Sequence, residues 1–393
     1  MRILTVLTYY RPHTSGLTIY AERLARALVF KGHEVTILTS QFAADQPRHS
    51  LEHGVRVVRV PVAFRLGKGV LMPRFPWTAF RLMDEHDIVH LHLPQLDGAA
   101  VALLARLKRK PVVSTYHCDL NLPAGLGNRM TGMVMRWANN TAGRCSHRVA
   151  AYTDDFAEHS PFLRRFRSKR RIILPPVELP TSPPATMAAV ASANNPDNRR
   201  PVIGMATRFA TEKGIEVLLA ALPRVLKQFP QALVWFAGQH EGVWGEEKYR
   251  ARLNKQIEKF QQAGAWKFLG TLPPEQLAAF YSCLDVLVVP SLNLTETFGL
   301  VQIEAMLHGT PVIASNLPGV RQPVQMSGMG MVIPIGDAES LANAIGEVCN
   351  QPKSNYSSHL DLAKEFSPQT NAERYIHIYR ELTDKQPAVA AIQ

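Results

Sequence analysis

The stretch VLVVPSLNLTETFGLVQIEAMLHGTPVIA, residues 286–314, contains a strand, a polar loop, a helix and a second strand, in that order. The runs Val286–Val289 and Pro311–Ala314 are short and apolar, as buried strands are, and Gly299–His308 has the length and pattern of a helix. Gly309, with a proline two residues later, is typical of a helix end. Because successive strands joined by a helix run parallel, this stretch predicts a parallel β-sheet covered by helices.

The same alternation extends through the rest of the chain. Further strands are expected at Arg2–Thr8, His33–Thr39, Val55–Val60, Ile88–His92, Val112–Tyr116, Arg148–Tyr152, Val202–Met205, Ala232–Ala237 and Trp266–Leu269. Further helices are expected at Tyr20–Lys31, Glu216–Gln228, Lys248–Ala263 and Pro274–Ser282. The alternation stops between residues 175 and 200, where six prolines stand among Ala, Ser, Thr and Asn. That composition is typical of a linker.

The chain has 393 residues, more than one hydrophobic core usually organises, so two domains are expected. We place the first domain at residues 1–178, the linker at 179–200 and the second domain at 201–365. Residues 366–393 are expected to form a C-terminal helix that returns toward the first domain. The predicted fold class is α/β, with two doubly wound, Rossmann-like domains facing each other across a deep cleft.

Composition sets the broad class of the protein. Hydrophobic residues make up 46% and charged residues 19% of the chain, an ordinary globular balance. The sequence has no run of eighteen apolar residues and no secretory leader pattern at its N-terminus. The four cysteines form no C-x-x-C pair, so we expect reduced thiols in a cytoplasmic protein.

The formal net charge of +12 is concentrated in the first half of the chain. Residues 1–180 contain 26 Lys and Arg against 13 Asp and Glu, whereas residues 181–393 contain 18 against 19. Such a positive field attracts anions in general, whether nucleic acid, phosphorylated substrates or lipid headgroups.

Two carboxylates flank the start of the helix expected at Gly299–His308. Glu296 precedes this helix and Glu304 lies on it, eight residues further on. Ligands of open parallel sheets bind beyond the carboxyl ends of the strands, and a helix N-terminus there attracts anions. A span of ~12 Å along a helix suits two hydroxyl-rich rings on either side of a diphosphate. The alternative is a capping glutamate followed by a solvated one.

A second candidate group, Arg208 and Lys213, follows the first strand of the second domain. The planar guanidinium and the compact ammonium could both neutralise a diphosphate, and they could stabilise its charge as it leaves. The alternative is an ordinary solvated loop.

The first domain offers two more positions. Gly16 follows the first strand and permits close approach of a ligand to the backbone, and His117 stands just past the end of another strand. Such a histidine either points into the cleft or has a structural role, with its hydrogen bonds made within the protein. His90 and His92 share a strand face without a third ligand, and the sequence contains no D-x-D, so no metal is expected. G-x-G-x-x-G and P-loop patterns are also absent.

Together these residues resemble the family 4 retaining glycosyltransferases, which have the GT-B fold, and the resemblance extends over nearly the whole chain. It is carried by Gly32-His33-Glu34-Val35, Asp87-Ile88-Val89-His90-Leu91-His92, Tyr116-His117, Pro175-Pro176-Val177-Glu178, Ala237-Gly238, Phe268-Leu269-Gly270, Asp285-Val286 through Pro290-Ser291, and Gly309-Thr310-Pro311-Val312-Ile313-Ala314. The most specific match is the E-x7-E pattern formed by Glu296 and Glu304.

The resemblance implies a role for each residue of the second-domain helix start. Glu296 would hold hydroxyls of the donor sugar, and Glu304 would hold the ribose hydroxyls. The backbone amides of Phe298, Gly299 and Leu300 would meet the diphosphate of the donor.

The resemblance also implies roles for the other candidates. Arg208 and Lys213 would stabilise the leaving group, and His117 would sit at the donor sugar near the acceptor. Gly16 would let the first domain close on the phosphates. Ser15 is a departure, because the family often has a second glycine at that position, so the path of this loop stays open.

The expected function is therefore retaining transfer of a hexose from a UDP- or GDP-linked donor to a hydroxyl acceptor, such as a lipid or glycan precursor. Neither a cofactor nor a metal is expected. A sugar-nucleotide epimerase on the same fold is the first alternative. A non-catalytic binder of nucleotide sugars or nucleic acid is the second, although the basic run at 164–171 has no recognised nucleic-acid module around it.

A contact with an anionic membrane surface is a further expectation. Basic residues alternate with Leu, Met, Phe and Trp across residues 65–81, including Lys68, Arg74 and Trp77. Residues 121–137 add further Leu, Met and Arg and end on Trp137. The alternative is that these side chains line a pocket for an acceptor or pack beneath a loop.

Overall fold

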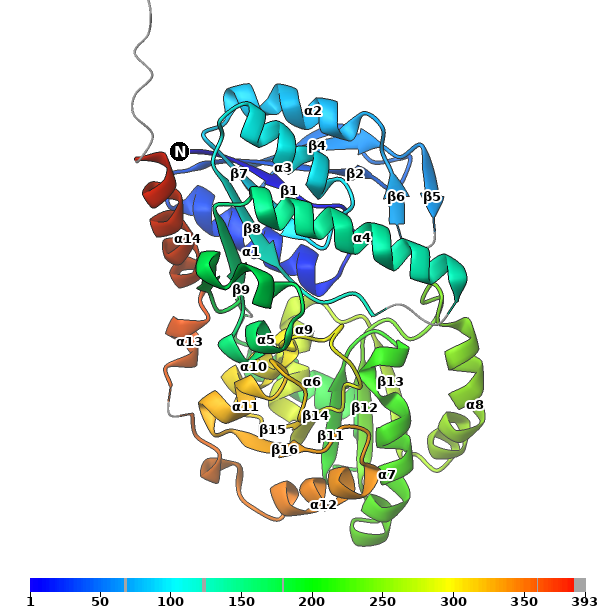
Figure 1. Cartoon of the computed structure of the whole chain (residues 1–393). Helices are drawn as coiled ribbons and strands as arrows, with labels where there is room; N and C mark the ends of the chain where they lie inside the picture. The colour runs from blue at the N-terminus through cyan, green and yellow to red at the C-terminus, as the bar shows by residue number, and fades with distance from the viewer. Residues whose placement is uncertain (67–68, 122–124, 179, 359, 385–393) are drawn as a thin grey trace, which may run out of the picture. The chain divides into compact units, whose positions relative to one another are not determined.

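Strands and helices alternate along almost the entire chain (Figure 1). The computed structural model describes residues 1–66, 69–121, 125–178, 180–358 and 360–384. The chain divides into two compact units: unit 1 comprises Met1–Pro176 together with the segment from Phe366, and unit 2 comprises Val177–Glu365. Each unit is built on its own twisted sheet of mainly parallel strands.

Unit 1 contains an eight-stranded sheet in the order β10-β9-β8-β7-β1-β2-β4-β3. Its strands are β1 (Arg2–Val6), β2 (Glu34–Gln41), β3 (His49–Glu52), β4 (Val55–Pro61), β7 (Ile88–Leu93), β8 (Val112–Tyr116), β9 (Arg148–Ala151) and β10 (Arg170–Ile172). All neighbours are parallel except β3 and β4. A small separate ribbon pairs β5 (Phe64–Leu66) with β6 (Gly69–Leu71). In the eight-stranded sheet, the direction of the strand order reverses at β1, which is hydrogen-bonded to both β2 and β7.

The helices of unit 1 cover both faces of its sheet. They are α1 (Gly16–Phe30), α2 (Phe75–Leu82), α3 (Gly98–Leu107), α4 (Leu126–Cys145), α5 (Asp154–His159) and α14 (Pro368–Thr383), with short 3-10 turns at Met83–Glu85 and Leu163–Lys169. Apolar side chains of α2, α3 and α4 join strand residues such as Val6, Val89 and Leu91 in one buried cluster.

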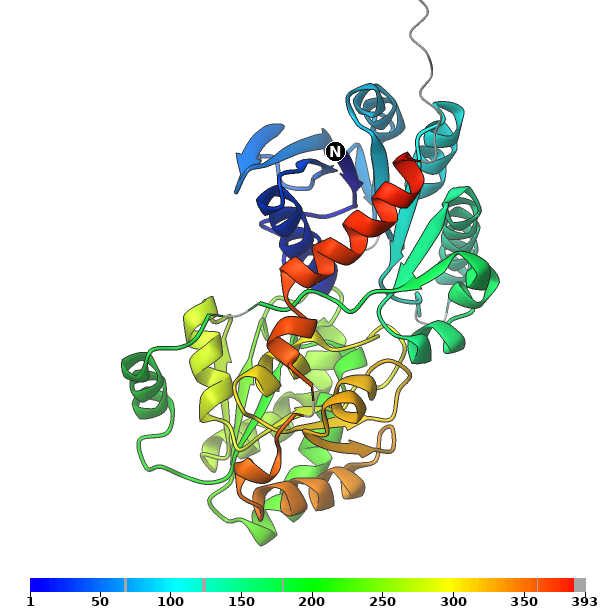
Figure 2. The same cartoon turned by 90° about the vertical axis from the view of Figure 1, so that its left-hand side faces the viewer.

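The C-terminal helix α14 belongs to unit 1, where it lies beside α1 (Figure 2). Tyr375 shares a hydrogen bond with the hydroxyl of Tyr20 at 2.8 Å, and the Tyr379 hydroxyl bonds to His90 Nδ1 at 2.7 Å. Its buried aromatic residues therefore complete the packing around the first strands of the chain.

Unit 2 contains a six-stranded, fully parallel sheet in the order β13-β12-β11-β14-β15-β16. Its strands are β11 (Val202–Ala206), β12 (Leu233–Ala237), β13 (Trp266–Gly270), β14 (Val286–Val289), β15 (Val312–Ser315) and β16 (Gly330–Ile333). Its helices are α6 (Pro184–Asn194), α7 (Ile215–Gln228), α8 (Glu247–Gln262), α9 (Pro274–Cys283), α10 (Leu300–Leu307), α11 (Gln322–Ser327), α12 (Ala338–Cys349) and α13 (Leu362–Glu365). The order reverses between β11 and β14, where a doubly wound sheet leaves a crevice at its carboxyl edge.

The strands and helices expected from the sequence are confirmed to within two residues, except at the start of one helix. Helix α1 begins at Gly16 instead of Tyr20, because Ser15 caps it. The Ser15 hydroxyl accepts from the amide of Thr18 at 3.2 Å, and the Thr18 hydroxyl accepts from the amide of Ser15 at 2.7 Å. This reciprocal capping box extends the helix by one turn.

The stretch expected as a linker, residues 179–200, differs from that expectation because it contains helix α6. Its sequence PATMAAVASAN is rich in alanine and has proline at the first helical position, which favours a helix. The helix packs beside α9, and the Cys283 thiol lies 3.8 Å from the carbonyl of Met187.

Candidate functional site

The candidate residues of unit 2 lie on two loops that leave neighbouring strands. Strands β11 and β14 are paired in parallel, so the loops that follow them emerge at the same carboxyl edge. The loop after β11 leads into α7 and carries Arg208 and Lys213, while the loop after β14 leads into α10 and carries Glu296.

These two loops are held together at Gly214. This residue has φ of +69°, and a Cβ added to it would stand 2.0 Å from the carbonyl oxygen of Pro290. The amide of Leu292 also donates to the carbonyl of Glu212 at 2.9 Å. Only glycine therefore permits the approach that brings the β11 loop against the end of β14.

The approach places Lys213 against Glu296. The ammonium donates a hydrogen bond to Glu296 Oε2 and forms an ion pair with it. Both side chains are about four-fifths covered, with 19% and 18% of their surface exposed. A cation and a carboxylate thus face each other at the reversal point of the sheet.

Arg208 has a different partner. Its Nη2 lies 3.3 Å from Glu212 Oε1, and 43% of its side chain is exposed. The structure thus pairs Lys213, but not Arg208, with the carboxylate that the sequence singled out.

The start of α10 is shaped by glycine and by a buried amide. Gly299 has φ of +75° and precedes the first helical residue, Leu300. The Gln302 amide donates to the carbonyls of Phe298 at 2.6 Å and Val320 at 2.9 Å, which anchors the turn. The first amides of a helix have no acceptor within it, so this turn presents donors at the carboxyl edge of β14.

Glu304 lies on α10 with only 5% of its surface exposed. The hydroxyl of Tyr281, a fully buried residue of α9, donates to Glu304 Oε2 at 3.0 Å. Tyr281 is a candidate site residue that the sequence did not predict, since no local pattern links it to a residue on the next helix.

Two serine hydroxyls complete the carboxyl edge. Ser291 follows β14 and Ser315 ends β15, and both are buried. Within the described part of the chain, neither hydroxyl oxygen has a hydrogen-bond partner. Buried hydroxyls are normally satisfied, so these two oxygens keep hydrogen-bonding capacity at the carboxyl edge of the sheet.

In unit 1, His117 follows β8 and is 5% exposed. Its Nε2 shares a hydrogen bond with Nδ1 of His92 at 2.8 Å, and its Nδ1 bonds to the hydroxyl of Tyr152. Burial, followed by the nearby His92, holds the pKa of His117 well below its usual value. The imidazole is therefore neutral, and both of its ring nitrogens already have partners.

The ring of His92 lies between those of His117 and His90, with centroids 5.0 Å and 4.5 Å away. Burial lowers the pKa of His92 to about 3. His90 bonds to Thr115 at 2.8 Å and to Tyr379 at 2.7 Å. Among the residues that the structure describes, no three His, Cys, Asp or Glu side chains form a group suited to a metal ion.

Gly16 is the first residue of α1, and Ser15 caps that helix in extended conformation, with φ of −152°. A Cβ added to Gly16 would meet nothing within 4 Å. Packing within the chain therefore does not require glycine here, and the backbone is open to approach.

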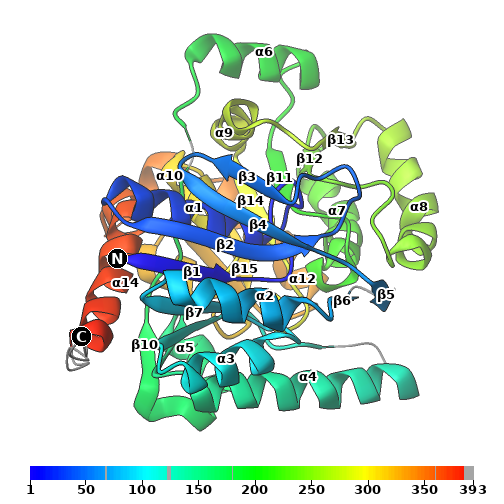
Figure 3. The same cartoon turned by 90° about the horizontal axis from the view of Figure 1, so that it is seen from above.

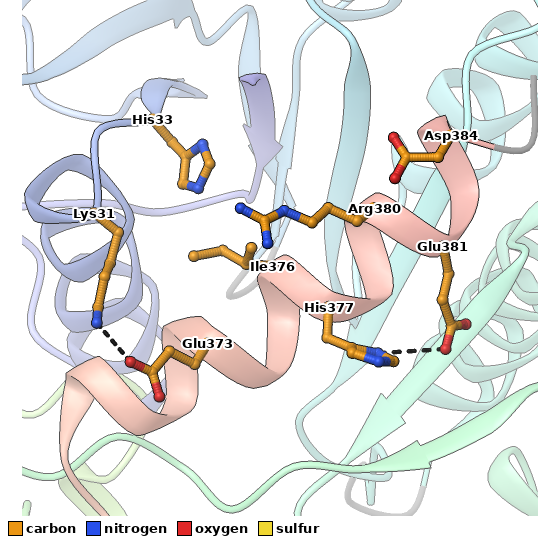
Figure 4. A pocket seen from close by; sticks show the side chains of 8 residues that line it. All are labelled: Lys31, His33, Glu373, Ile376, His377, Arg380, Glu381 and Asp384. Carbon is orange, nitrogen blue, oxygen red and sulfur yellow. Dashed lines mark hydrogen bonds and ion pairs between the residues drawn. The ribbon is translucent and has the colours of Figure 1, made fainter.

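A cavity of about 640 Å³ lies elsewhere, between the end of α1 and α14 (Figure 4). It is lined by Lys31, His33, Glu373, Ile376, His377, Arg380, Glu381 and Asp384. His33 precedes β2, so this cavity is at the amino ends of the strands, away from the carboxyl edge that carries His117. Charges of both signs line it, and none of the candidate residues does.

Two mainly parallel, doubly wound sheets of this kind are the architecture of the GT-B fold. Residues 15–176 match the family model described as "Glycosyl transferase 4-like domain", and residues 189–365 match "Glycosyl transferases group 1". The two models together span most of the chain, which belongs to these glycosyltransferases, and the predicted family and fold are confirmed.

Sequence relatives extend over most of the chain. A phosphatidyl-myo-inositol mannosyltransferase of Mycobacterium leprae (strain TN) is 26% identical over 350 residues, covering 88% of this chain and 86% of the relative. A 2-deoxystreptamine N-acetyl-D-glucosaminyltransferase of Streptomyces fradiae is 28% identical over 362 residues, covering 84% and 82%.

Solved structures agree in fold. HepE of Anabaena in complex with UDP has a TM-score of 0.77 at 20% identity, covering 97% of this chain and 100% of that chain. Sucrose-phosphate synthase from Thermosynechococcus elongatus has a TM-score of 0.76 at 23% identity, covering 98% and 100%. At this level of identity the likeness defines the architecture alone.

Proposed function

We propose that this chain transfers a hexose from a UDP- or GDP-linked donor to a hydroxyl acceptor, with retention of the anomeric configuration. The relatives that match most of its length are named as a mannosyltransferase and an N-acetylglucosaminyltransferase, and one solved structure of the same fold holds UDP. We propose a lipid or glycan precursor as the acceptor, and the name of the mannosyltransferase relative specifies a lipid, phosphatidyl-myo-inositol.

The observation that carries the proposal is the pair of Lys213 and Glu296 at the reversal point of the unit 2 sheet. Without donor, each charge compensates the other. With donor, Glu296 accepts hydrogen bonds from sugar hydroxyls, and Lys213 turns toward the phosphates. Arg208 adds a second cation there once it leaves Glu212, and the amides of the α10 start meet the diphosphate.

In the transfer step, the acceptor oxygen bonds to the anomeric carbon while the bond from that carbon to the phosphate oxygen breaks. The acceptor proton passes to the departing phosphate oxygen, on the face that the nucleotide leaves. Lys213 and Arg208 stabilise the negative charge that develops on the diphosphate. Neither a metal ion nor a separate cofactor is required in this scheme.

The remaining candidates position the substrates. Glu304 holds the ribose hydroxyls with the carboxylate oriented by Tyr281. His117 stands at the donor sugar near the acceptor, as a neutral imidazole that exchanges one of its present partners for a sugar hydroxyl. Gly16 lets the backbone of unit 1 approach the phosphates.

Product stereochemistry tests the proposal. UDP- and GDP-hexoses are screened with hydroxyl acceptors for release of nucleoside diphosphate, and the new glycosidic bond is examined by proton NMR. An α-linked product from an α-configured donor is expected. A β-linked product would overturn retention, and acceptor-independent conversion of the donor sugar would favour an epimerase.

A further inference from the structure

Three neighbouring helices of unit 1 carry positive charge and no negative charge. Helices α2, α3 and α4 contain no Asp or Glu, and they carry Arg81, Arg106, Arg129, Arg136 and Arg144. They pack side by side, α2 on α3 and α3 on α4, against the same buried cluster (Figure 3). Helices α1, α5 and α14 each contain acidic residues, so the absence is particular to this face.

The first three turns of α4 are free of the core. No residue of Leu126–Trp137 is buried, and burial begins at Ala138. In Figure 3 this part of α4 runs out beyond the end of α3. A helix without packing partners over this length is marginal in water, so its free face needs another explanation.

That free face is an apolar stripe. Leu126 is 83% exposed and Trp137 is 63% exposed, and the exposed apolar residues of α4 are Leu126, Met130, Met133, Val134 and Trp137. The spacing i, i+4, i+7, i+8, i+11 places them on one side of the helix, and the buried Asn139 and Ala142 lie on the other side. The neighbouring helices add exposed Trp77 and Leu107.

The cations beside this stripe are uncompensated. Among the described residues, no ion pair engages Arg129 or Arg136, and both are exposed. The nearest acids along the chain from α2 are already paired: Asp84 with Lys108 and Glu85 with Arg56. The combination of an apolar stripe, tryptophan and flanking arginines is typical of helices that lie in a lipid headgroup region.

We infer that the α2–α3–α4 face of unit 1 docks on an anionic lipid bilayer, with the α4 stripe at the headgroup boundary and Arg129 and Arg136 on lipid phosphates. The charge of this face favours an anionic bilayer over a second copy of the chain as its partner. A symmetric dimer through this face would place arginines against arginines with no carboxylate between them.

The structure also locates the contact more sharply than the sequence did. Within the segment 65–81, Met72 and Phe75 are buried in the core, and Lys68 lies outside the described residues. Trp77 remains exposed, and α4 supplies most of the apolar surface. No helix in the described residues has the length and apolar character to cross a bilayer, so this docking concerns the surface of the membrane.

Flotation with lipid vesicles tests the inference on the full chain. Vesicles of phosphatidylcholine are compared with vesicles of phosphatidylcholine mixed with phosphatidylglycerol. The chain is expected to float with the mixed vesicles and to be released by salt. R129Q/R136Q should weaken this binding roughly 30-fold, which corresponds to about 1 kcal/mol for each arginine near the surface.

A charge-matched variant controls for general attraction. R164Q/R165Q removes the same charge from exposed positions on the 3-10 turn Leu163–Lys169 and should leave vesicle binding nearly unchanged. For the stripe, L126S/M130S should weaken binding, whereas Phe30→Ser, also at an exposed apolar position, should not. All these side chains are exposed, so thermal melting should show intact folds.

Three outcomes would overturn the inference: no binding to the mixed vesicles, equal weakening by both arginine pairs, or a dimer that R129Q/R136Q dissociates without any vesicle binding. The test is separate from the proposed function, because none of these residues belongs to the transfer site. Nucleotide release with a water-soluble acceptor should therefore persist in every variant, and its absence would count against the transferase proposal alone.

Discussion

Glu296 and Glu304 are eight residues apart, yet they meet different surroundings. Glu296 is partly exposed on a loop and pairs with Lys213, whereas Glu304 is buried on α10 and accepts from Tyr281. A carboxylate with a dedicated buried donor has a fixed orientation, which suits recognition of a constant group such as ribose. A carboxylate in an exchangeable ion pair suits a group that changes during reaction.

We therefore predict that Glu304→Gln weakens binding of a free nucleoside diphosphate, while Glu296→Gln spares it and impairs use of the donor sugar. Loss of a charged hydrogen-bond acceptor costs about 1.5–3 kcal/mol, or roughly tenfold to over a hundredfold in affinity. Isothermal titration with UDP and GDP measures this. Tyr281→Phe, which only frees the Glu304 carboxylate, should have a smaller effect. Equal losses in both glutamate variants would contradict the division of roles.

The buried histidines predict a dependence of stability on pH. Folded His92, with its pKa lowered by burial to about 3, stays neutral where the unfolded chain gains a proton, below about pH 6.5. The unfolded state binds more protons in this window, so the free energy of unfolding falls as the pH decreases through it. For this residue the loss is roughly 2–3 kcal/mol at about pH 4.5.

Urea unfolding at neutral pH and near pH 4.5 should show this loss, and His92→Phe should reduce it by a similar amount. The phenyl ring keeps the stacking on His90 and His117 but binds no proton. If the free energy of unfolding decreases equally with pH in wild type and variant, the neutral state of His92 is not the cause of the pH dependence.

Gly214 connects the β11 loop to the end of β14. Gly214→Ala should destabilise the fold by roughly 3–5 kcal/mol. The alanine would have to keep the left-handed backbone conformation, and its Cβ would lie 2.0 Å from the carbonyl oxygen of Pro290. Gly309→Ala is the matched control. Gly309 has φ of +72° but open space around it, so only about 1–2 kcal/mol is expected.

Thermal melting and nucleotide binding measure the two glycine variants together. Because the loop of Gly214 carries Lys213, nucleotide binding should fall in Gly214→Ala and persist in Gly309→Ala. Equal stability of the two variants would show that the close contact of Gly214 with Pro290 does not hold the two loops together.

Elements differed in how well the sequence predicted them. Strands β11 and β14 are continuous apolar runs that can be recognised from the local sequence, and their predicted bounds are exact or within one residue. Helices α2 to α6 and α11 to α13 were not predicted. Helix α4 exposes its apolar side chains, and α6 has no buried residue, so neither shows the stripe facing a core by which a helix is recognised.

In the proposed scheme, the positive charge that neutralises the diphosphate comes from the protein and not from a metal ion. We predict that turnover survives chelation by EDTA, since Arg208, Lys213 and the α10 start supply the positive field. Lys213→Ala should lower turnover by roughly 10²–10³-fold, as loss of one stabilising group at a developing anion does. Activity abolished by EDTA and restored by Mg²⁺ or Mn²⁺ would refute this scheme.

The amino-acid sequence was enough to predict most of the alternation of strands and helices, because apolar periodicity is a local property. It also determined the loops that carry Lys213, Glu296 and His117, because in a parallel sheet the functional loops directly follow strand ends. The family pattern of Glu296 and Glu304 needed no tertiary structure to be recognised.

Which of these residues come into contact depends on the three-dimensional fold. Lys213 and Glu296 are 83 residues apart, and they form a pair because β11 and β14 are neighbours and Gly214 permits the close approach. Likewise, His117 is neutral because strand pairing of β7 with β8 brings His92 beside it and removes both from water. Partners and burial depend on contacts between distant segments, which local residue patterns do not encode.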